Sequence, residues 1–100
     1  MQKLVNDFIK KYKLQTDEQI RYIDLVSEVG ELGKEIIKGS DYGKKLFVKT
    51  NQTQNEIGDC IFSLLALCCS LDINAEEAVK NSLSKYQKRF SEKGNISSDD

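Results

Sequence analysis

The chain has 100 residues, a formal net charge of −1, no proline and no histidine. Without histidine, Ser-His, Cys-His and His-zinc chemistry are all excluded, and carboxylates are the main reactive groups that remain. Lysines and acids are mixed along the chain, so it has no basic stripe for a phosphate backbone, and we do not expect nucleic acid as a partner.

The hydrophobic pattern indicates one all-α domain without a membrane segment. Strand-type alternation is scarce, and the N-terminus has no apolar signal core. The longest uncharged apolar run, residues 60–71, is too short to cross a bilayer, so we expect a soluble, cytoplasmic protein. Because a chain this short buries only a modest fraction of its surface, we expect a domain over residues 1–94 that association completes, followed by a disordered tail at residues 95–100.

A first, short amphipathic helix is predicted from Gln2 to about Lys13, because apolar residues recur there every three or four positions. Its aromatic residues Phe8 and Tyr12 have two interpretations. Either they stack on the base of a bound ligand, or they only pack this helix onto the rest of the bundle. The sequence leaves both interpretations open.

A long second helix is predicted from Thr16, which forms a capping-box pattern with Gln19, to Lys38. Gly39 supplies its C-terminal stop. Within this helix Gly30 and Gly33 each cost about 1 kcal/mol relative to alanine. We therefore expect some other group to come close to the helix backbone at these two positions.

A four-residue phrase of acid, β-branched residue, glycine and acid occurs twice, from Glu28 to Glu31 and from Glu56 to Asp59. In an α-helix the two acids of each phrase are i,i+3 neighbours and share one face. If a helical hairpin brings the two pairs together, two charges about 6 Å apart repel by roughly 3 kcal/mol at an effective dielectric of ~20. We therefore predict that these four acids bind Mg²⁺ or Mn²⁺, and that the metal in turn holds phosphates.

The two phrases have different surroundings. The acids of the first lie beside Lys34 and Lys38, as on an ordinary solvated helix face, and alone they leave that alternative open. After Asp59 no charge occurs before Asp72, and apolar residues cover nearly the whole circumference, as in a buried helix. The acids of the second phrase are therefore predicted at the mouth of a buried helix, where carboxylates are rarely left without a partner.

A last helix is predicted from Ala75 to about Ser91, with Asn74 as its N-cap and Gly94 as its stop. One of its faces is polar and mostly basic. Cations opposite a cluster of carboxylates and metal can bind the outer oxygens of a polyphosphate. The alternative is that these cations only suit the negative end of the helix dipole. This basic strip consists of Asn81, Lys85, Lys88 and Arg89.

The two phrases, with 24 residues between them, resemble the E-x-x-E and E-x-x-D motifs of the MazG-like all-α nucleoside triphosphate pyrophosphohydrolases. The flanks contribute to the resemblance: Leu25-Val26-Ser27 precedes the first phrase, and Cys60-Ile61-Phe62 follows the second. The similarity spans about residues 4–90 and includes the basic strip of the last helix. Either motif alone is weak, but the two together, in this order, are fairly specific.

The resemblance implies a four-helix-bundle unit that forms a homodimer or homotetramer. It also implies cleavage of a nucleoside triphosphate between its α- and β-phosphates, giving a nucleoside monophosphate and pyrophosphate. As a hypothesis of our own, Glu31 or Glu28 orients the attacking water. The implied Mg²⁺ ligands are Glu28, Glu31, Glu56 and Asp59. The implied substrate contacts are Asn81, Lys85 and Arg89, with Phe8 and Tyr12 as further candidates.

Two other functions stay open. One is a non-catalytic helical domain that dimerises through the apolar segment at residues 60–71. The other is an enzyme similar to phosphoribosyl-ATP pyrophosphohydrolase. The motifs also leave open the preferred base and sugar, the number of metal ions and subunits, and whether the role is sanitation of the nucleotide pool or supply of a monophosphate.

Overall fold

The computed structural model of the chain describes residues 1–95, and the predicted tail lies, from residue 96 onward, outside the described residues. Residues 1–95 form four α-helices and no strand, which confirms the all-α class. None of the helices in this part of the chain combines the length and the apolarity that a membrane span needs. The helices are α1 (Gln2–Lys11), α2 (Glu18–Gly39), α3 (Asn51–Ser70) and α4 (Ala75–Lys93).

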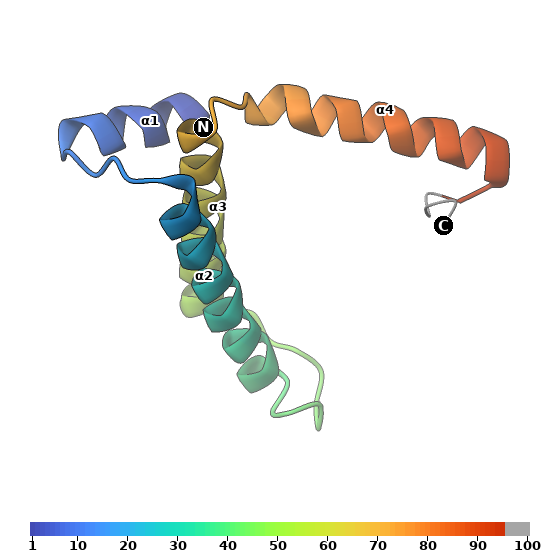
Figure 1. Cartoon of the computed structure of the whole chain (residues 1–100). Helices are drawn as coiled ribbons and strands as arrows, with labels where there is room; N and C mark the ends of the chain where they lie inside the picture. The colour runs from blue at the N-terminus through green and yellow to red at the C-terminus, as the bar shows by residue number, and fades with distance from the viewer. Residues whose placement is uncertain (96–100) are drawn as a thin grey trace.

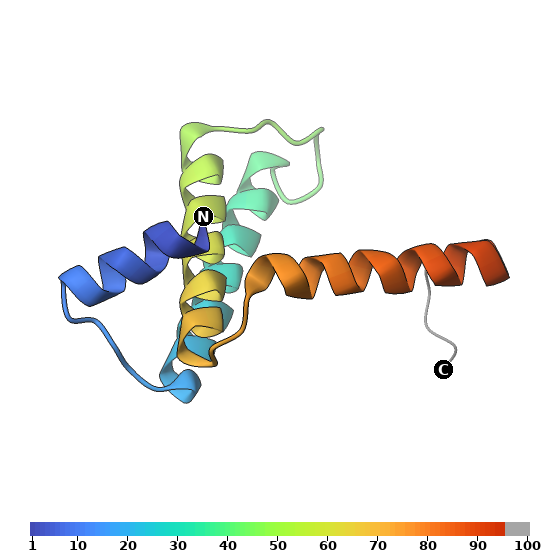
Figure 2. The ribbon, with the colours of Figure 1, turned by 90° about the horizontal axis from the view of Figure 1, so that it is seen from above.

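The helices α2 and α3 lie side by side as an antiparallel hairpin, which is the main packed unit of the chain (Figure 1). The shorter helix α1 packs against α3. In both views α1 and α4 extend to opposite sides of the hairpin, and α4 points away from it along its whole length (Figure 2). The expected four helices are therefore present, but they do not close into a bundle within one chain.

Side-chain caps fix where α2 and α3 begin. The Asp17 carboxylate accepts a hydrogen bond from the backbone of the first turn of α2 at 2.9 Å, so the N-cap is Asp17 rather than the predicted Thr16. At α3, Thr50 and Thr53 form a capping box in which each side chain bonds the backbone of the other residue. This box starts α3 at Asn51, five residues before the second acidic phrase.

The two ends of α4 agree with the sequence prediction. Asn74 caps its N-terminus, and Gly94 ends it with a φ of +74°, a left-handed conformation that favours glycine. The side chain of Gln2, from α1, holds the turn before α4: its Nε2 donates to the carbonyl of Ile73, and its Oε1 accepts from the backbone N–H of Ala75, both at 2.7 Å. These two hydrogen bonds fix the point from which α4 leaves the hairpin.

The apolar core of a single chain is small. Among the described residues, the buried apolar side chains are Ile9, Leu65 and Ala66, and α4 contributes no buried residue. The chain exposes 7916 Å² of surface, whereas a compact monomer of 11.4 kDa exposes about 5,800 Å². Its radius of gyration is 16.8 Å, against about 13 Å for a compact domain of this length. A single chain therefore leaves much apolar surface uncovered.

Candidate metal centre

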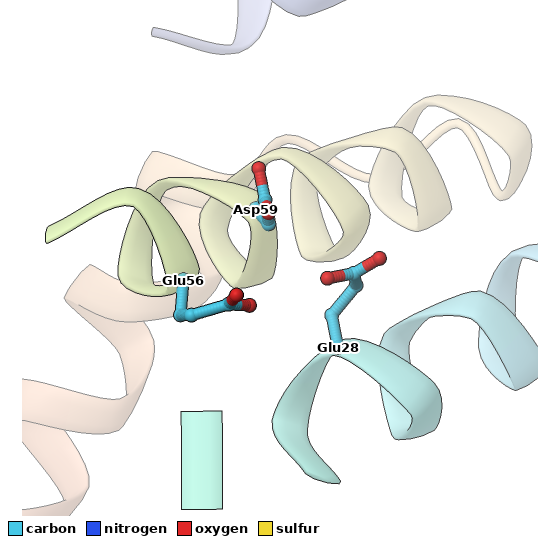
Figure 3. A group of neighbouring side chains, drawn as sticks. All are labelled: Glu28, Glu56 and Asp59. Carbon is cyan, nitrogen blue, oxygen red and sulfur yellow. The ribbon is translucent and has the colours of Figure 1, made fainter. Parts of the chain in front are cut away.

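The hairpin brings three acids of the two repeated phrases together. Glu28 projects from α2, and Glu56 and Asp59 project from α3. One carboxylate oxygen of each residue lies within 4.8 Å of those of the other two. In Figure 3 the side chains of Glu28 and Glu56 extend toward each other across the space between the two helices. We call these three residues the acid cluster.

The acid cluster runs from the protein interior to the solvent. Glu56 is buried, with 9% of its surface exposed, whereas Glu28 is half-buried and Asp59 is exposed. The side-chain amide of Gln52 donates a hydrogen bond from Nε2 to Glu56 Oε1 at 2.6 Å, which orients the buried carboxylate. The cluster therefore has one fixed inner ligand and an open outer side that a ligand can reach.

The electrostatics of the acid cluster are strongly negative. Partial burial raises the pKa of Glu28, and the nearby charges of Asp59 and Glu56 raise it further. Burial also raises the pKa of the Cys60 thiol, and the three acids add to that effect. Among the described residues, no lysine or arginine forms an ion pair with a member of the cluster. Within residues 1–95 of a single chain, these charges are therefore not balanced by an ion pair.

The raised pKa of Glu28 predicts how stability changes with pH when no divalent cation is present. Between the ordinary value of 4.5 and the raised pKa, the folded state binds more protons than the unfolded state. The contribution of Glu28 to the free energy of unfolding is therefore fully present below pH 4.5 and is lost as the pH rises through the raised pKa. Urea denaturation at a series of pH values, in the presence of EDTA, measures this loss.

The matched variant for that measurement is Glu28→Gln, which keeps the shape of the side chain and removes its titration. We expect the wild type to lose more stability than this variant as the pH rises from 4.5. Parallel pH profiles for the two proteins would contradict the raised pKa.

The donor set of the acid cluster fits a hard divalent cation. Mg²⁺ and Mn²⁺ take oxygen ligands, and Mg²⁺ is bound in proteins by a few carboxylates while water and substrate phosphates complete its octahedral shell. Three carboxylates that are close enough to share an ion, one of them buried and without a cationic partner, meet this requirement. Glu28, Glu56 and Asp59 are therefore the residues that could hold such a cation.

The fourth predicted acid, Glu31, lies outside this group of three. Its Oε1 is 3.8 Å from the Nζ of Lys34, and more than half of its side chain is exposed. The charge of Glu31 nevertheless contributes to the raised pKa of Glu28. Glu31 is thus near the acid cluster without being part of it in this conformation.

The predicted aromatic contacts belong to a small cluster between α1 and α3. The ring centroids of Phe8 and Tyr12 are 4.8 Å apart. The ring of Phe8 also meets that of Phe62 edge to face, with 5.9 Å between their centroids. Phe8 therefore packs α1 onto α3, as in the second of the two interpretations. About half of the surface of Phe8 and of Tyr12 is still exposed. Because Phe62 follows Asp59 by three residues, the aromatic cluster begins one helical turn from the acid cluster.

The structure does not bring the basic strip to the acid cluster of its own chain. Asn81, Lys85 and Arg89 all belong to α4, which points away from the hairpin (Figures 1 and 2). Lys85 instead places its Nζ 5.1 Å from the centre of the Tyr86 ring. The predicted substrate residues therefore form two separate groups in a single chain.

One residue of the site was not predicted. Gln52 lies in the first turn of α3, and its amide holds the buried carboxylate of Glu56. The i,i+4 spacing of these two residues was a usable signal, because side chains four positions apart lie on the same face of a helix.

The family model for the MazG nucleotide pyrophosphohydrolase domain matches residues 15–92. The chain belongs to this family. A similar protein is the "Uncharacterized protein YpjD" of Bacillus subtilis (strain 168), which is 38% identical over 68 residues. That alignment covers 65% of this chain and 60% of the relative, so the chain spans less than two thirds of the relative's length. No solved structure matches the chain.

The family match covers most of the candidate site residues but not all of them. The matched residues include α2, α3 and α4, and therefore the acid cluster, Glu31 and the basic strip. The helix α1, which contains Phe8, lies before the matched range, and so does Tyr12 directly after it. Any role of the aromatic cluster in binding therefore depends on contacts in this chain rather than on the family match.

Proposed function

We propose that this chain is a Mg²⁺-dependent nucleoside triphosphate pyrophosphohydrolase, which cleaves between the α- and β-phosphates and releases a nucleoside monophosphate and pyrophosphate. The observation that carries the proposal is the acid cluster: three carboxylate oxygens within 4.8 Å of one another, in a chain of the MazG family. Mn²⁺ would substitute for Mg²⁺ because both prefer oxygen ligands.

Each acid would have a distinct part in this reaction. Glu56, fixed by Gln52, and the exposed Asp59 would hold the metal from α3, and Glu28 would hold it from α2. Glu31 would join them by leaving Lys34, an exposed pair that costs little to separate. When bound, Mg²⁺ supplies positive charge that stabilises the negative charge developing on the phosphoryl oxygens.

The attacking water needs a base within hydrogen-bond reach. Glu28 and Glu31 are the two candidates, and they would orient the water for in-line attack on the α-phosphorus while pyrophosphate departs on the opposite side. Both are carboxylates of the same acidic phrase, and either could accept the proton of the attacking water.

Substrate binding would use the two groups of residues outside the acid cluster. Phe8 and Tyr12 each keep about half of their surface exposed, and an exposed ring can stack on a nucleobase. Asn81, Lys85 and Arg89 would bind the phosphate oxygens that the metal does not reach. We expect the active form to be a homodimer or a homotetramer, because a single chain covers so little of its apolar surface.

The test is a substrate panel with two readouts. The purified chain is incubated with Mg²⁺ and each common ribo- and deoxyribonucleoside triphosphate, and also with phosphoribosyl-ATP. Phosphorus NMR then identifies the products. We expect equal amounts of monophosphate and pyrophosphate, and no reaction in EDTA.

Other products would overturn the proposal. Release of orthophosphate would contradict cleavage between the α- and β-phosphates. Turnover of phosphoribosyl-ATP alone would assign the enzyme to that substrate. No turnover of any member of the panel would favour a non-catalytic helical domain.

A further inference from the structure

A small polar cavity lies where α1, α2 and α3 meet. Its volume is about 80 Å³. Ile9 from the last turn of α1 and Ala66 from the second half of α3 form its apolar wall. We call this space the Arg21 cavity. The polar residues that line it are Asn6, Gln15, Thr16, Arg21, Cys69 and Ser70.

Arg21 is the one charged residue of the described chain that lines the Arg21 cavity, and it is buried. Only 8% of its surface is exposed. A guanidinium keeps its positive charge in proteins, and its removal from water costs free energy unless hydrogen bonds or an anion replace that water. The buried charge of Arg21 therefore needs partners at this position.

The chain supplies only some of these partners. Nη2 of Arg21 donates a hydrogen bond to the carbonyl of Leu14, and residues 1–95 give this guanidinium no other hydrogen bond and no ion pair. Asp17, one turn earlier, uses its carboxylate to cap α2. The carbonyl ends of α1 and α3 offset a further part of the charge through the helix dipoles. The remaining N–H groups of Arg21 are available to an anion.

Other side chains around the cavity add hydrogen-bond donors. The amides of Asn6 and Gln15 and the hydroxyl of Thr16 form no hydrogen bond within residues 1–95. No carboxylate from this part of the chain lines the cavity. Amide and hydroxyl donors around an arginine, without an acid among them, are suited to an oxyanion.

The size of the cavity favours a phosphate group. A single water needs about 10 to 15 Å³ of such space, whereas drug-sized ligands fill pockets of about 300 to 1,000 Å³. The Arg21 cavity therefore has room for an ion of a few non-hydrogen atoms and not for a whole nucleoside. Gln15 and Ser70 are exposed, so a ligand can enter from solvent on their side. Among small anions, phosphate matches the bidentate geometry of arginine.

The Arg21 cavity is separate from the acid cluster. Arg21 lies seven residues before Glu28, which is about 10 Å along α2. Cys69 lies ten residues after Asp59, which is about 15 Å along α3. A phosphate in the cavity would therefore not occupy the metal centre.

We propose that the Arg21 cavity binds a phosphate group, with the guanidinium of Arg21 as its main contact and with Asn6, Gln15 and Thr16 around it. The bound phosphate joins α1 and the segment that follows it to the hairpin, and so stabilises the folded chain. This binding is independent of the proposed hydrolase activity, because no residue of the acid cluster or of the basic strip takes part in it.

The test compares the wild type with Arg21→Met in inorganic phosphate, with EDTA and at constant ionic strength. Methionine is unbranched and uncharged, and it adapts to irregular buried space. At a phosphate concentration of about four times the Kd, the melting temperature of the wild type should rise by about 4 to 8 °C. Arg21→Met should show only the general effect of phosphate on protein stability. Isothermal titration calorimetry should detect phosphate binding by the wild type and none by Arg21→Met.

A second variant tests the cavity without removing the buried charge. Thr16→Val removes one hydroxyl at nearly constant shape, and the cap of α2 stays in place because Asp17 provides it. We expect this variant to bind phosphate about 3- to 10-fold more weakly than the wild type. Lys11→Gln, an exposed position in the last turn of α1 that does not line the cavity, is the matched control and should bind phosphate as the wild type does.

Adenosine monophosphate, tested in the same way, distinguishes two sources of the phosphate group. Binding of inorganic phosphate alone assigns the cavity to the free ion. Binding of the monophosphate that is lost in Arg21→Met assigns it to the terminal phosphate of a nucleotide.

Three results would overturn the proposal. The first is a wild type that gives no calorimetric signal with either ligand, and the second is an equal response of the wild type and Arg21→Met. The third is a response that is kept in Arg21→Met and lost in Lys85→Ala/Arg89→Ala, because the phosphate would then bind the basic strip. In each case Arg21 would be a structural residue that the carbonyl of Leu14 and the helix ends satisfy.

Discussion

Asp59→Asn is expected to lower the rate of pyrophosphate release at least about 100-fold, which corresponds to about 2.7 kcal/mol of transition-state stabilisation. The substitution keeps the size of the side chain and removes one of the three negative charges that would hold the metal. Because Asp59 is exposed, the change should leave the free energy of unfolding within about 0.5 kcal/mol of the wild type. Pyrophosphate release over a range of Mg²⁺ concentrations measures the effect.

The matched control for this substitution is Glu18→Gln. Glu18 is an exposed acid in the first turn of α2, ten residues before Glu28, and so about 15 Å from the acid cluster. We expect it to retain wild-type turnover and wild-type dependence on Mg²⁺. If Asp59→Asn kept normal activity while it remained folded, the carboxylates named here would not form the active site.

Leu65→Ala is expected to have the largest effect on stability, a loss of about 2 to 5 kcal/mol in the free energy of unfolding. Leu65 is 7% exposed, and only two other apolar residues of the described chain, Ile9 and Ala66, are as deeply buried. A small domain has a total stability of only about 5 to 15 kcal/mol, so this loss is a large share of it. Urea denaturation followed by circular dichroism measures the difference.

The control for the core is the same substitution at an exposed leucine. Leu46 lies between α2 and α3 with 90% of its surface exposed, so Leu46→Ala should change the stability by less than about 0.5 kcal/mol. Both variants are compared with the wild type at one protein concentration, because association makes the apparent stability depend on concentration. Equal effects of the two substitutions would contradict the assignment of Leu65 to the core.

The helices were predictable because their determinants are local. Apolar spacing predicted α1, the capping pattern and the stop at Gly39 bounded α2, and Asn74 and Gly94 marked the two ends of α4 where the structure has its caps. The start of α3 was missed because Thr53 occupies the position that glutamate or glutamine usually fills in a capping box. At α2 the capping-box pattern placed the cap one residue early, at Thr16, because the carboxylate of Asp17 supplies the observed cap.

The acid cluster was partly predictable. Spacing of three residues shows that two acids share a face of one helix, and this predicted the pairs from each phrase. The meeting of Glu28 with Glu56 and Asp59 depends on how α2 packs against α3, which no local pattern specifies. The side chain of Glu31 lies toward Lys34. Whether this carboxylate pairs with Lys34 or joins the acid cluster depends on tertiary packing, which the sequence pattern does not specify.

The position of α4 was not predictable from its own sequence. An apolar stripe with a basic strip beside it shows that a helix packs and that it carries charge, but not which surface covers it. The sequence analysis therefore grouped Lys85 and Arg89 with the acids, whereas a single chain holds the two groups apart (Figure 1). Periodicity within one helix does not specify the surface against which that helix packs.

Titration of the protein with Mn²⁺, followed by electron paramagnetic resonance of the free ion, tests the central claim most directly. We expect the wild type to remove Mn²⁺ from solution, Mg²⁺ to displace it, and the variant Glu28→Gln/Glu56→Gln/Asp59→Asn to bind none at the same concentrations. Equal binding of Mn²⁺ by the wild type and this variant would show that the acid cluster is not the metal site.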